Sequence, residues 1–324
     1  MAETHEERVV TVSQEDKSNF KRLDQYLAEK FEDLSRTFIK TLFSNGQIEL
    51  EPAGKLELKK MPKVGSKIII QLPPPIPIEA EPENIPLKIL FEDEHLIIVD
   101  KPAGLVVHPA PGNYTGTLVN AILFHCPDLK GIGDKKRPGI VHRLDKGTSG
   151  VMVVAKAQKA HEKLVEMFSK HDIERRYEAI AFSKNLKISG IIESNIGRDP
   201  RNRIKMAANV SRGKEAITHY KVLDVFNKFS HLELKLETGR THQIRVHLST
   251  ILKAPILCDP VYANCKNQVN SLSLEYKNLL KDYPYQLLHA KILGFKHPIT
   301  EEQLYFETPP PEVFQKVLEL ARNE

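Results

Sequence analysis

The chain has 324 residues, of which 41% are hydrophobic and 27% are charged, and this composition is typical of a globular protein with more than one domain. It has no apolar run of the roughly 20 residues that a membrane helix needs, its N-terminus does not resemble a secretory signal, and its three cysteines form no CxxC pair. These features argue against membrane, secreted and zinc-ribbon proteins, and the net charge of +5 favours polyanionic partners in a reducing cytoplasm.

The distribution of charge and proline predicts the domain organisation. Residues 1–18 are net acidic, and we predict that they form a flexible tail ahead of a more basic body. Six prolines in residues 73–87 predict an extended, semi-rigid linker. The linker would separate a small unit at 19–72 from a large unit at 88–324.

The small unit is predicted to contain two short helices and a small sheet. Apolar residues recur at helical spacing over 23–31 and 38–43, and Ser35 is placed to cap the second helix. An Asn45-Gly46 turn and two β-type segments, at 48–50 and 67–72, follow. The helices also carry cationic side chains on their polar faces, which suit either nucleic acid or plain solvation: Arg22, Arg36 and Lys40.

The large unit mixes strands with helices. Residues 216–223 and 231–236 alternate polar and apolar side chains, which predicts half-buried strands, whereas the apolar runs 96–99 and 151–155 predict strands buried on both faces. Helices are predicted at 158–169 and 311–321. This pattern indicates an α+β fold built on a mixed, largely antiparallel sheet with flanking helices.

The densest group of polar residues in an apolar setting is 142–150, His-Arg-Leu-Asp-Lys-Gly-Thr-Ser-Gly, which leads into the buried strand at 151–155. A loop that presents Arg143 and Asp145 at a strand edge is a typical place for an active site. The alternative is an ordinary turn in which Asp145 caps neighbouring amides.

A second group lies at 237–248, Glu-Thr-Gly-Arg-Thr-His-Gln-Ile-Arg-Val-His-Leu, where a strand passes into a helix whose predicted apolar face is Ile244, Leu248 and Ile251. Arginine, histidine and glutamine at a helix N-terminus suit the binding of an anion or carboxylate, although a solvated first turn is the simpler alternative.

Two further segments carry no function when taken alone. Residues 100–109 read as a turn, and Tyr177, on a strand at 174–180, reads as a core residue.

Taken in order, these four segments resemble the RluA family of pseudouridine synthases: DKPAGLVVHP at 100–109, HRLDKGTSG at 142–150, the tyrosine-bearing strand, and ETGRTHQIRVHL at 237–248. The small unit is similar to an S4-type RNA-binding module, and the arrangement is similar to the RluD type, which acts on large-subunit ribosomal RNA. The resemblance implies the fold of that family, the isomerisation of uridine in RNA, and no requirement for a cofactor or metal. We expect a monomer.

The resemblance also implies roles for individual residues. Asp145 is the expected catalytic carboxylate, Arg245 is the cation that keeps it ionised, and Tyr177 stacks on the flipped uracil. Leu144 is expected in the apolar wall of the site. The residues expected to contact RNA are Arg143, His142, His108 and Arg240 in the large unit, and Arg22, Ser35, Arg36 and Lys40 in the small one.

Two positions depart from the family pattern, which commonly has an acidic residue at Gly147 and glycine at Cys258. Alternatives to a synthase for ribosomal RNA are one that acts on transfer RNA and a non-catalytic RNA-binding ribosome assembly factor. A hydrolase that uses Ser149 with His142 or His242 as base is disfavoured, because the chain has no nucleophile elbow.

Overall fold

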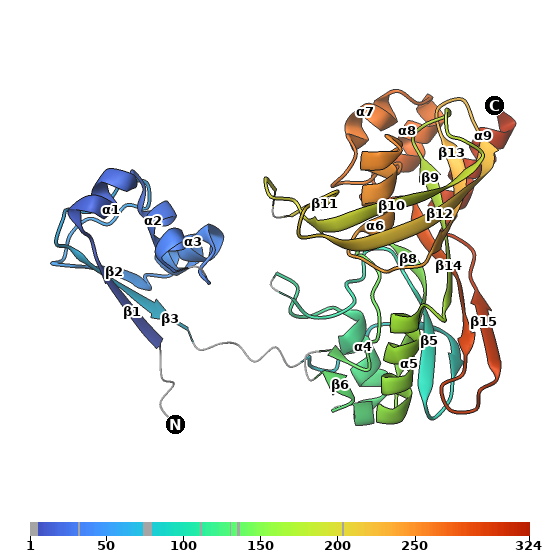
Figure 1. Cartoon of the computed structure of the whole chain (residues 1–324), viewed down its shortest axis with the longest axis horizontal. Coiled ribbons are helices and arrows are strands. Elements are labelled where there is room, and N and C mark those ends of the chain that lie inside the picture. Colours follow the sequence, from blue (N-terminus) through green and yellow to red (C-terminus); the bar gives the residue numbers. More distant parts are fainter. Residues whose placement is uncertain are drawn as a thin grey trace. The chain divides into compact units, whose positions relative to one another are not determined.

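The computed structural model describes residues 6–31, 33–73, 80–110, 112–129, 131–134, 137–202 and 204–324. The chain divides into two compact units, Met1–Pro77 and Ile78–Glu324 (Figure 1). The boundary falls within the proline-rich segment predicted as a linker, of which residues 74–79 lie outside the described residues. Among the described helices, none is both long and apolar enough to cross a membrane.

The small unit packs three helices on a three-stranded antiparallel sheet of order β1-β3-β2. Its core is apolar and includes Tyr26 and Ile39, both almost fully buried. The elements are β1 (Glu6–Thr11), α1 (Gln14–Asn19), α2 (Leu23–Lys30), α3 (Arg36–Ser44), β2 (Ile48–Glu51) and β3 (Lys67–Leu72).

The prediction of an acidic flexible tail over residues 1–18 is wrong for residues 6–18. Val10 and Val12 are buried in the core of the small unit, and β1 pairs with β3 along its whole length. The acidic composition has a local use instead: Ser13 and Asp16 form a capping box at the start of α1. Composition alone therefore misjudged a segment whose acidic side chains lie on the surface of ordered structure.

Two of the arginines expected to contact RNA hold the fold of the small unit. Asp24 is fully buried, and its carboxylate accepts hydrogen bonds from Arg22 Nε at 2.9 Å and Arg36 Nη2 at 2.7 Å. Ser35 caps α3 through its hydroxyl, and Lys40 is exposed. The bond from Arg22, opposed by burial and aided by Arg36, lowers the pKa of Asp24 to about 2.

The large unit is built on one ten-stranded sheet, of order β11-β10-β12-β13-β9-β14-β8-β5-β4, with β15 paired to β14. All neighbours are antiparallel except β14 and β8, which confirms the predicted largely antiparallel α+β fold. The strands are β4 (Lys88–Glu92), β5 (Leu96–Lys101), β8 (Ser149–Ala155), β9 (Glu174–Ala181), β10 (Ser189–Arg198), β11 (Met206–Ala208), β12 (Lys214–Val225), β13 (Ser230–Leu236), β14 (Leu288–Lys296) and β15 (Gln303–Glu307), with a separate pair, β6 (Gly133–Asp134) and β7 (Arg137–Pro138).

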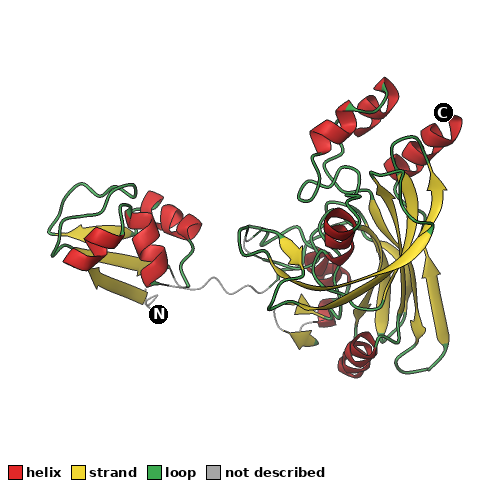
Figure 2. Ribbon diagram, turned by 45° about the horizontal axis from the view of Figure 1, so that its top comes forward, coloured by secondary structure: helices red, strands yellow, loops and turns green. Residues whose placement is uncertain are grey.

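Helices pack beside the curved sheet (Figure 2). Every residue of β8 is buried, as its continuous apolar run predicts, because one face packs against α5 and the other contributes to the main core. The helices are α4 (Leu118–His125), η1 (Pro127–Leu129), α5 (Gln158–Lys170), α6 (Gln243–Val246), the π-helical η2 (His247–Ile251), α7 (Cys265–Asn270), α8 (Leu274–Leu280) and α9 (Glu312–Asn323). Asp145 lies four residues before β8, so a rigid strand fixes the loop that carries it.

The ion pairs of Asp24 with Arg22 and Arg36 lead to a pH-dependent prediction. Replacing both partners, in Arg22→Met/Arg36→Met, leaves a buried carboxylate without a cation and should weaken hydrogen-exchange protection of the α2 amides at neutral pH. The pKa of Asp24 is depressed, so the stability it contributes is present above its ordinary pKa of about 4 and is lost as the pH falls through about 2. The difference in amide protection between wild type and the double variant should therefore become smaller at low pH.

A matched control removes two exposed cations from the same helices, Lys30→Met/Lys40→Met. Equal loss of protection in both double variants would contradict the assignment, because it would trace the effect to net charge.

Candidate active site

A cavity of about 570 Å³ opens in the large unit. It is bounded by the loop before β8, the end of α5, β9 and the segment that enters α6. Its lining includes Asp145, Tyr177 and Arg245, which the sequence places far apart, together with His108, Arg137, Ile140, Val141, His142, Arg143, Leu144, Thr148, Phe168, Ser169, His171, Arg175, Leu236, Gly239, Arg240, Thr241, His242, Gln243, Ile244 and Leu288.

Asp145 is held by a charge-assisted hydrogen bond from Arg245. Arg245 Nη1 lies 2.9 Å from Asp145 Oδ2, and His242 Nε2 lies 3.9 Å from the other carboxylate oxygen. The side chain of Asp145 keeps 17% of its surface exposed, so it is accessible from the cavity. The two residues predicted to pair are therefore in contact, although 100 positions separate them.

The same guanidinium binds a second carboxylate that is more deeply buried. Arg245 Nε and Nη2 donate to the two oxygens of Asp259 at 2.8 and 2.9 Å, and the side chain of Asp259 is fully buried. Asp259 Oδ1 also accepts the backbone N–H groups of Val261 and Tyr262. Burial opposes the charge of Arg245, but Asp259 and then Asp145 raise its pKa above the ordinary arginine value.

Sequence reasoning gave no role to Asp259. The run Asp-Pro-Val-Tyr at 259–262 is visible in the sequence, but its position in space is not. Tyr262 also belongs to the site: its ring centroid lies 5.1 Å from the guanidinium carbon of Arg245, and its hydroxyl lies 2.9 Å from His242 Nδ1.

Tyr177 and Leu144 form part of the apolar lining of the cavity, and both are less than 10% exposed. Burial, more than any nearby charge, raises the pKa of Tyr177 above that of a free tyrosine. The phenol is therefore protonated at neutral pH, and it offers a ring face and a hydroxyl donor to a ligand.

The turn at 100–109 buries a cation beneath the loop that carries Asp145. Lys101 is fully buried, and its ammonium donates to the carbonyls of Pro102 and Leu105 at 2.9 Å and of Lys146 at 3.3 Å. Burial lowers the pKa of Lys101 to about 7, although the negative charge of Asp145 opposes that shift. This segment is more than a functionless turn, because it fixes the backbone next to the carboxylate.

The segment at 237–248 does not form the regular helix that its pattern predicts. α6 is a single turn that begins after His242, whose φ of +56° is left-handed, and η2 continues it as a π-helix. Ile244 and Leu248 are buried, but Ile251 is 37% exposed and does not belong to the buried face. A four-residue helix offers no N-terminal anion site, so the polar residues here act through their side chains.

The residues expected to contact RNA occupy different environments. Arg143 is exposed at the cavity, where His108 and Arg240 also line the wall, and Arg240 Nε donates to the Glu215 carbonyl at 2.8 Å. His142 Nε2, in contrast, accepts the N–H of Val153 at 3.2 Å.

The ring of His142 also stacks on Phe168, with centroids 4.5 Å apart. Burial, followed by the charge of Arg175, lowers the pKa of His142 to about 3, so the ring is neutral. A neutral ring in this environment does not suit a phosphate, and the expected contact of His142 with RNA stays a prediction. His142 instead supports β8 and the wall of the cavity.

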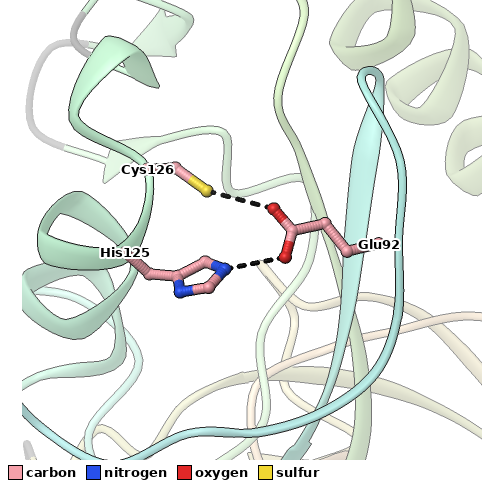
Figure 3. A group of neighbouring side chains, drawn as sticks. All are labelled: Glu92, His125 and Cys126. Carbon is pink, nitrogen blue, oxygen red and sulfur yellow. Dashed lines mark hydrogen bonds and ion pairs between the residues drawn. The ribbon is translucent and has the colours of Figure 1, made fainter.

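Among the described residues, three potential metal ligands lie together away from the cavity: Glu92, His125 and Cys126, within 4.8 Å of one another (Figure 3). Glu92 already lies 2.7 Å from His125 Nε2 and accepts a hydrogen bond from Lys156 Nζ at 2.5 Å. Burial raises the pKa of the Cys126 thiol to about 11. A cation would have to displace both an ammonium and a thiol proton. The contacts of Glu92 with His125, Cys126 and Lys156 instead form a polar network that ties β4 to α4.

Comparison with known proteins identifies related sequences. The sequence profile of the RNA pseudouridylate synthase family matches residues 95–250. The chain is 44% identical over 305 residues to the ribosomal large subunit pseudouridine synthase D of Zymomonas mobilis, which covers 92% of this chain and 93% of that protein. It is 41% identical over 315 residues to an uncharacterised RNA pseudouridine synthase of Bacillus subtilis, which covers 97% of this chain and 98% of that protein. Both alignments are longer than the large unit.

A solved structure is similar as well. Human RNA pseudouridylate synthase domain containing 4 matches with a TM-score of 0.53 and 28% identity, over 72% of this chain and 93% of that chain.

The shared guanidinium predicts a large and specific loss of stability. Arg245→Met leaves Asp259 buried without a cation and should lower the free energy of unfolding of the large unit by about 3–5 kcal/mol, measured by urea unfolding followed by circular dichroism. Neutralising the stranded carboxylate as well, in Arg245→Met/Asp259→Asn, should recover part of that loss.

The control is Arg212→Met, which removes an exposed arginine and should change stability by no more than about 0.5 kcal/mol. The single variant Asp259→Asn completes the comparison. If the loss of unfolding free energy in the double variant equals the sum of the losses in the two single variants, the two residues are energetically independent, which would contradict the observed contact.

Proposed function

The chain belongs to the family of RNA pseudouridine synthases, and from this premise we propose that it converts specific uridines of large-subunit ribosomal RNA to pseudouridine, with Asp145 as the catalytic carboxylate. Relatives named ribosomal large subunit pseudouridine synthase D, from Zymomonas mobilis and Pseudomonas aeruginosa, are 44% and 41% identical to it. These names support ribosomal RNA over transfer RNA as the substrate.

The observation that carries the catalytic assignment is the ion pair of Asp145 with Arg245 at the cavity. The reaction breaks the N1–C1′ bond of uridine, joins C5 to C1′, and transfers the C5 proton to N1, without net oxidation. Such a reaction requires a group that can act as nucleophile or base, and an ionised carboxylate can do either. Arg245 places its positive charge 2.9 Å from a carboxylate oxygen of Asp145, and Asp259 keeps the guanidinium in place.

The target base lies inside folded RNA and has to leave its stack to reach the cavity. We propose that Tyr177 stacks on the flipped uracil and that Leu144 contributes to the apolar wall. Arg143 is exposed beside Asp145, and in this proposal it occupies the vacated position and binds phosphate.

The small unit is proposed to be an S4-type RNA-binding module. Its β1-β3-β2 sheet and three helices form an independent core, and Lys40 is exposed on α3. Arg22 and Arg36 retain exposed side-chain surface of 34% and 47%, so they can contact RNA while they also hold Asp24. We propose that the protein acts as a monomer in the cytoplasm, and its three free cysteines suit that reducing compartment.

The catalytic assignment is tested by incubating purified protein with large-subunit ribosomal RNA transcript and mapping pseudouridine by carbodiimide chemistry. We expect new pseudouridine with the native chain and with the control Asp282→Asn, an exposed carboxylate outside the cavity. With Asp145→Asn we expect no new pseudouridine, because the amide cannot act as nucleophile or base.

If pseudouridine forms in transfer RNA and not in the ribosomal transcript, the proposed substrate is wrong and transfer RNA takes its place. RNA binding without any new pseudouridine would instead favour a non-catalytic assembly factor.

The role of Arg143 predicts a change in salt dependence. Arg143→Gln should weaken RNA binding, and it should reduce the slope of log affinity against log salt concentration by about one, because one phosphate contact is lost. Filter binding between 50 and 200 mM KCl measures both quantities. Lys296→Gln, which removes an exposed cation outside the cavity lining, is the matched control, and an equal change in its slope would argue against a specific contact.

A further inference from the structure

A second arginine of the cavity, Arg175 on β9, is buried without a carboxylate partner. It is only 7% exposed, and it forms no ion pair with an acidic side chain in the part of the chain that the structure describes. Its Nη2 donates to the Glu237 carbonyl at 2.7 Å, whereas its Nε is buried without a hydrogen-bond partner among the described residues. Burial lowers the pKa of Arg175 from its ordinary value.

This environment is the opposite of that of Arg245, which binds two carboxylates. A buried charge without a counter-ion costs free energy in the empty protein. An arginine remains protonated even when its pKa falls, so the cavity wall carries an uncompensated positive charge. Such a charge is suited to negative charge that arrives with a ligand.

The charge of Arg175 lies on the same face of β9 as the ring of Tyr177. Arg175 and Tyr177 are two residues apart on β9, so their side chains leave the same face of the sheet. Phe168 contacts the guanidinium, with its ring centroid 5.6 Å from the guanidinium carbon, and the neutral ring of His142 stacks on the same Phe168. A Cβ at Gly239 would lie only 2.9 Å from Arg175 Nη1, so the glycine leaves that nitrogen room.

The negative charge that arises at this place is that of the base itself. When the N1–C1′ bond breaks, its electron pair remains on uracil N1 and is shared with the O2 and O4 carbonyl oxygens. It returns as C5 bonds to C1′ and the C5 proton moves to N1. The phosphates stay on the outside of the nucleotide, where the exposed Arg143 can meet them.

We propose that Arg175 is a catalytic residue that donates a hydrogen bond to a carbonyl oxygen of the flipped uracil and stabilises the charge that the base gains when the N1–C1′ bond breaks. The proposal rests on the proposed function, since it concerns the same reaction. A donor aimed at developing charge lowers the transition state more than the bound ground state. Arg175 should therefore affect the rate of the bound complex more than the affinity for RNA.

The test compares Arg175→Met and Arg175→Lys with wild type in single-turnover reactions at saturating enzyme, alongside RNA affinity and thermal stability. Arg175→Met should reduce the rate by about 10²–10³-fold, with an RNA dissociation constant within threefold of wild type. Its melting temperature should not fall, because an unpaired buried charge is replaced by an apolar side chain of similar length. Arg175→Lys should recover part of the rate.

The matched control is Arg176→Met. Arg176 is the next residue on β9, and its guanidinium pairs with Glu174 and Glu233 outside the cavity lining, so its loss should leave the single-turnover rate unchanged.

Three results would overturn the proposal. An unchanged single-turnover rate in Arg175→Met would remove the catalytic role. Weaker RNA binding with a normal rate at saturation would make Arg175 a phosphate anchor instead. Parallel losses of rate and melting temperature in both variants would make it structural. If Arg175→Met does not fold, Arg175→Lys is the test of the catalytic role. We then expect its single-turnover rate to fall at least tenfold while its melting temperature equals that of wild type. Failure of the wild-type chain to modify any RNA is a separate outcome, and it refutes the proposed function.

Discussion

The arrangement of the cavity depends on one guanidinium that two carboxylates share. Asp259 takes two nitrogens of Arg245 and is completely buried, so it fixes the plane and direction of the guanidinium. The remaining nitrogen is thereby aimed at Asp145, which stays partly exposed. Asp259, the more deeply buried carboxylate, anchors the guanidinium, and Asp145, the more exposed one, is the carboxylate proposed to carry out the chemistry. Asp145 is 100 residues from Arg245 in the sequence and Asp259 is 14 residues from it, and burial makes the separation of these charges costly.

Two hydrogen bonds hold the loop that carries Asp145. The buried ammonium of Lys101 donates to the carbonyl of Lys146, and the amide of Gln286 donates to Thr148 Oγ1 at 2.9 Å. A Cβ at Gly147 would lie 2.5 Å from Gln286 Oε1, so the acidic residue that the resemblance leads us to expect there would require this amide to turn away. The departure at Gly147 is thus linked to a tighter contact on one side of the loop. Because β8 follows directly, a displacement of the loop would also disturb the core.

Sequence reasoning predicted the elements whose periodicity is strong, and the resemblance to a family predicted that Asp145, Tyr177 and Arg245 line one cavity. It did not predict the role of Asp259, because no local pattern distinguishes a buried anchor from a turn residue. Composition misjudged residues 6–18, where the burial of two valines, Val10 and Val12, matters more for order than the surplus of acidic side chains on the surface. Cys258 has a φ of +63°, a conformation that favours glycine, which is the residue that the resemblance leads us to expect at this position. The role of Asp259, the order of residues 6–18 and the conformation of Cys258 all depend on tertiary contacts, which the sequence does not show.

The two buried arginines of the cavity, Arg175 and Arg245, have different electrostatic environments because their neighbours differ. Arg245 is neutralised in advance, so it organises the carboxylate of Asp145 without adding net charge to the site. Arg175 has no such partner among the described residues, and the ring beside it, His142, is kept neutral by burial. A neutral imidazole and an apolar Phe168 neither screen nor repel the guanidinium. In the proposed function, the cavity thus combines the carboxylate of Asp145 with a positive charge that faces the flipped base. Separation of charge across a breaking N1–C1′ bond is the process that such a polarity would favour.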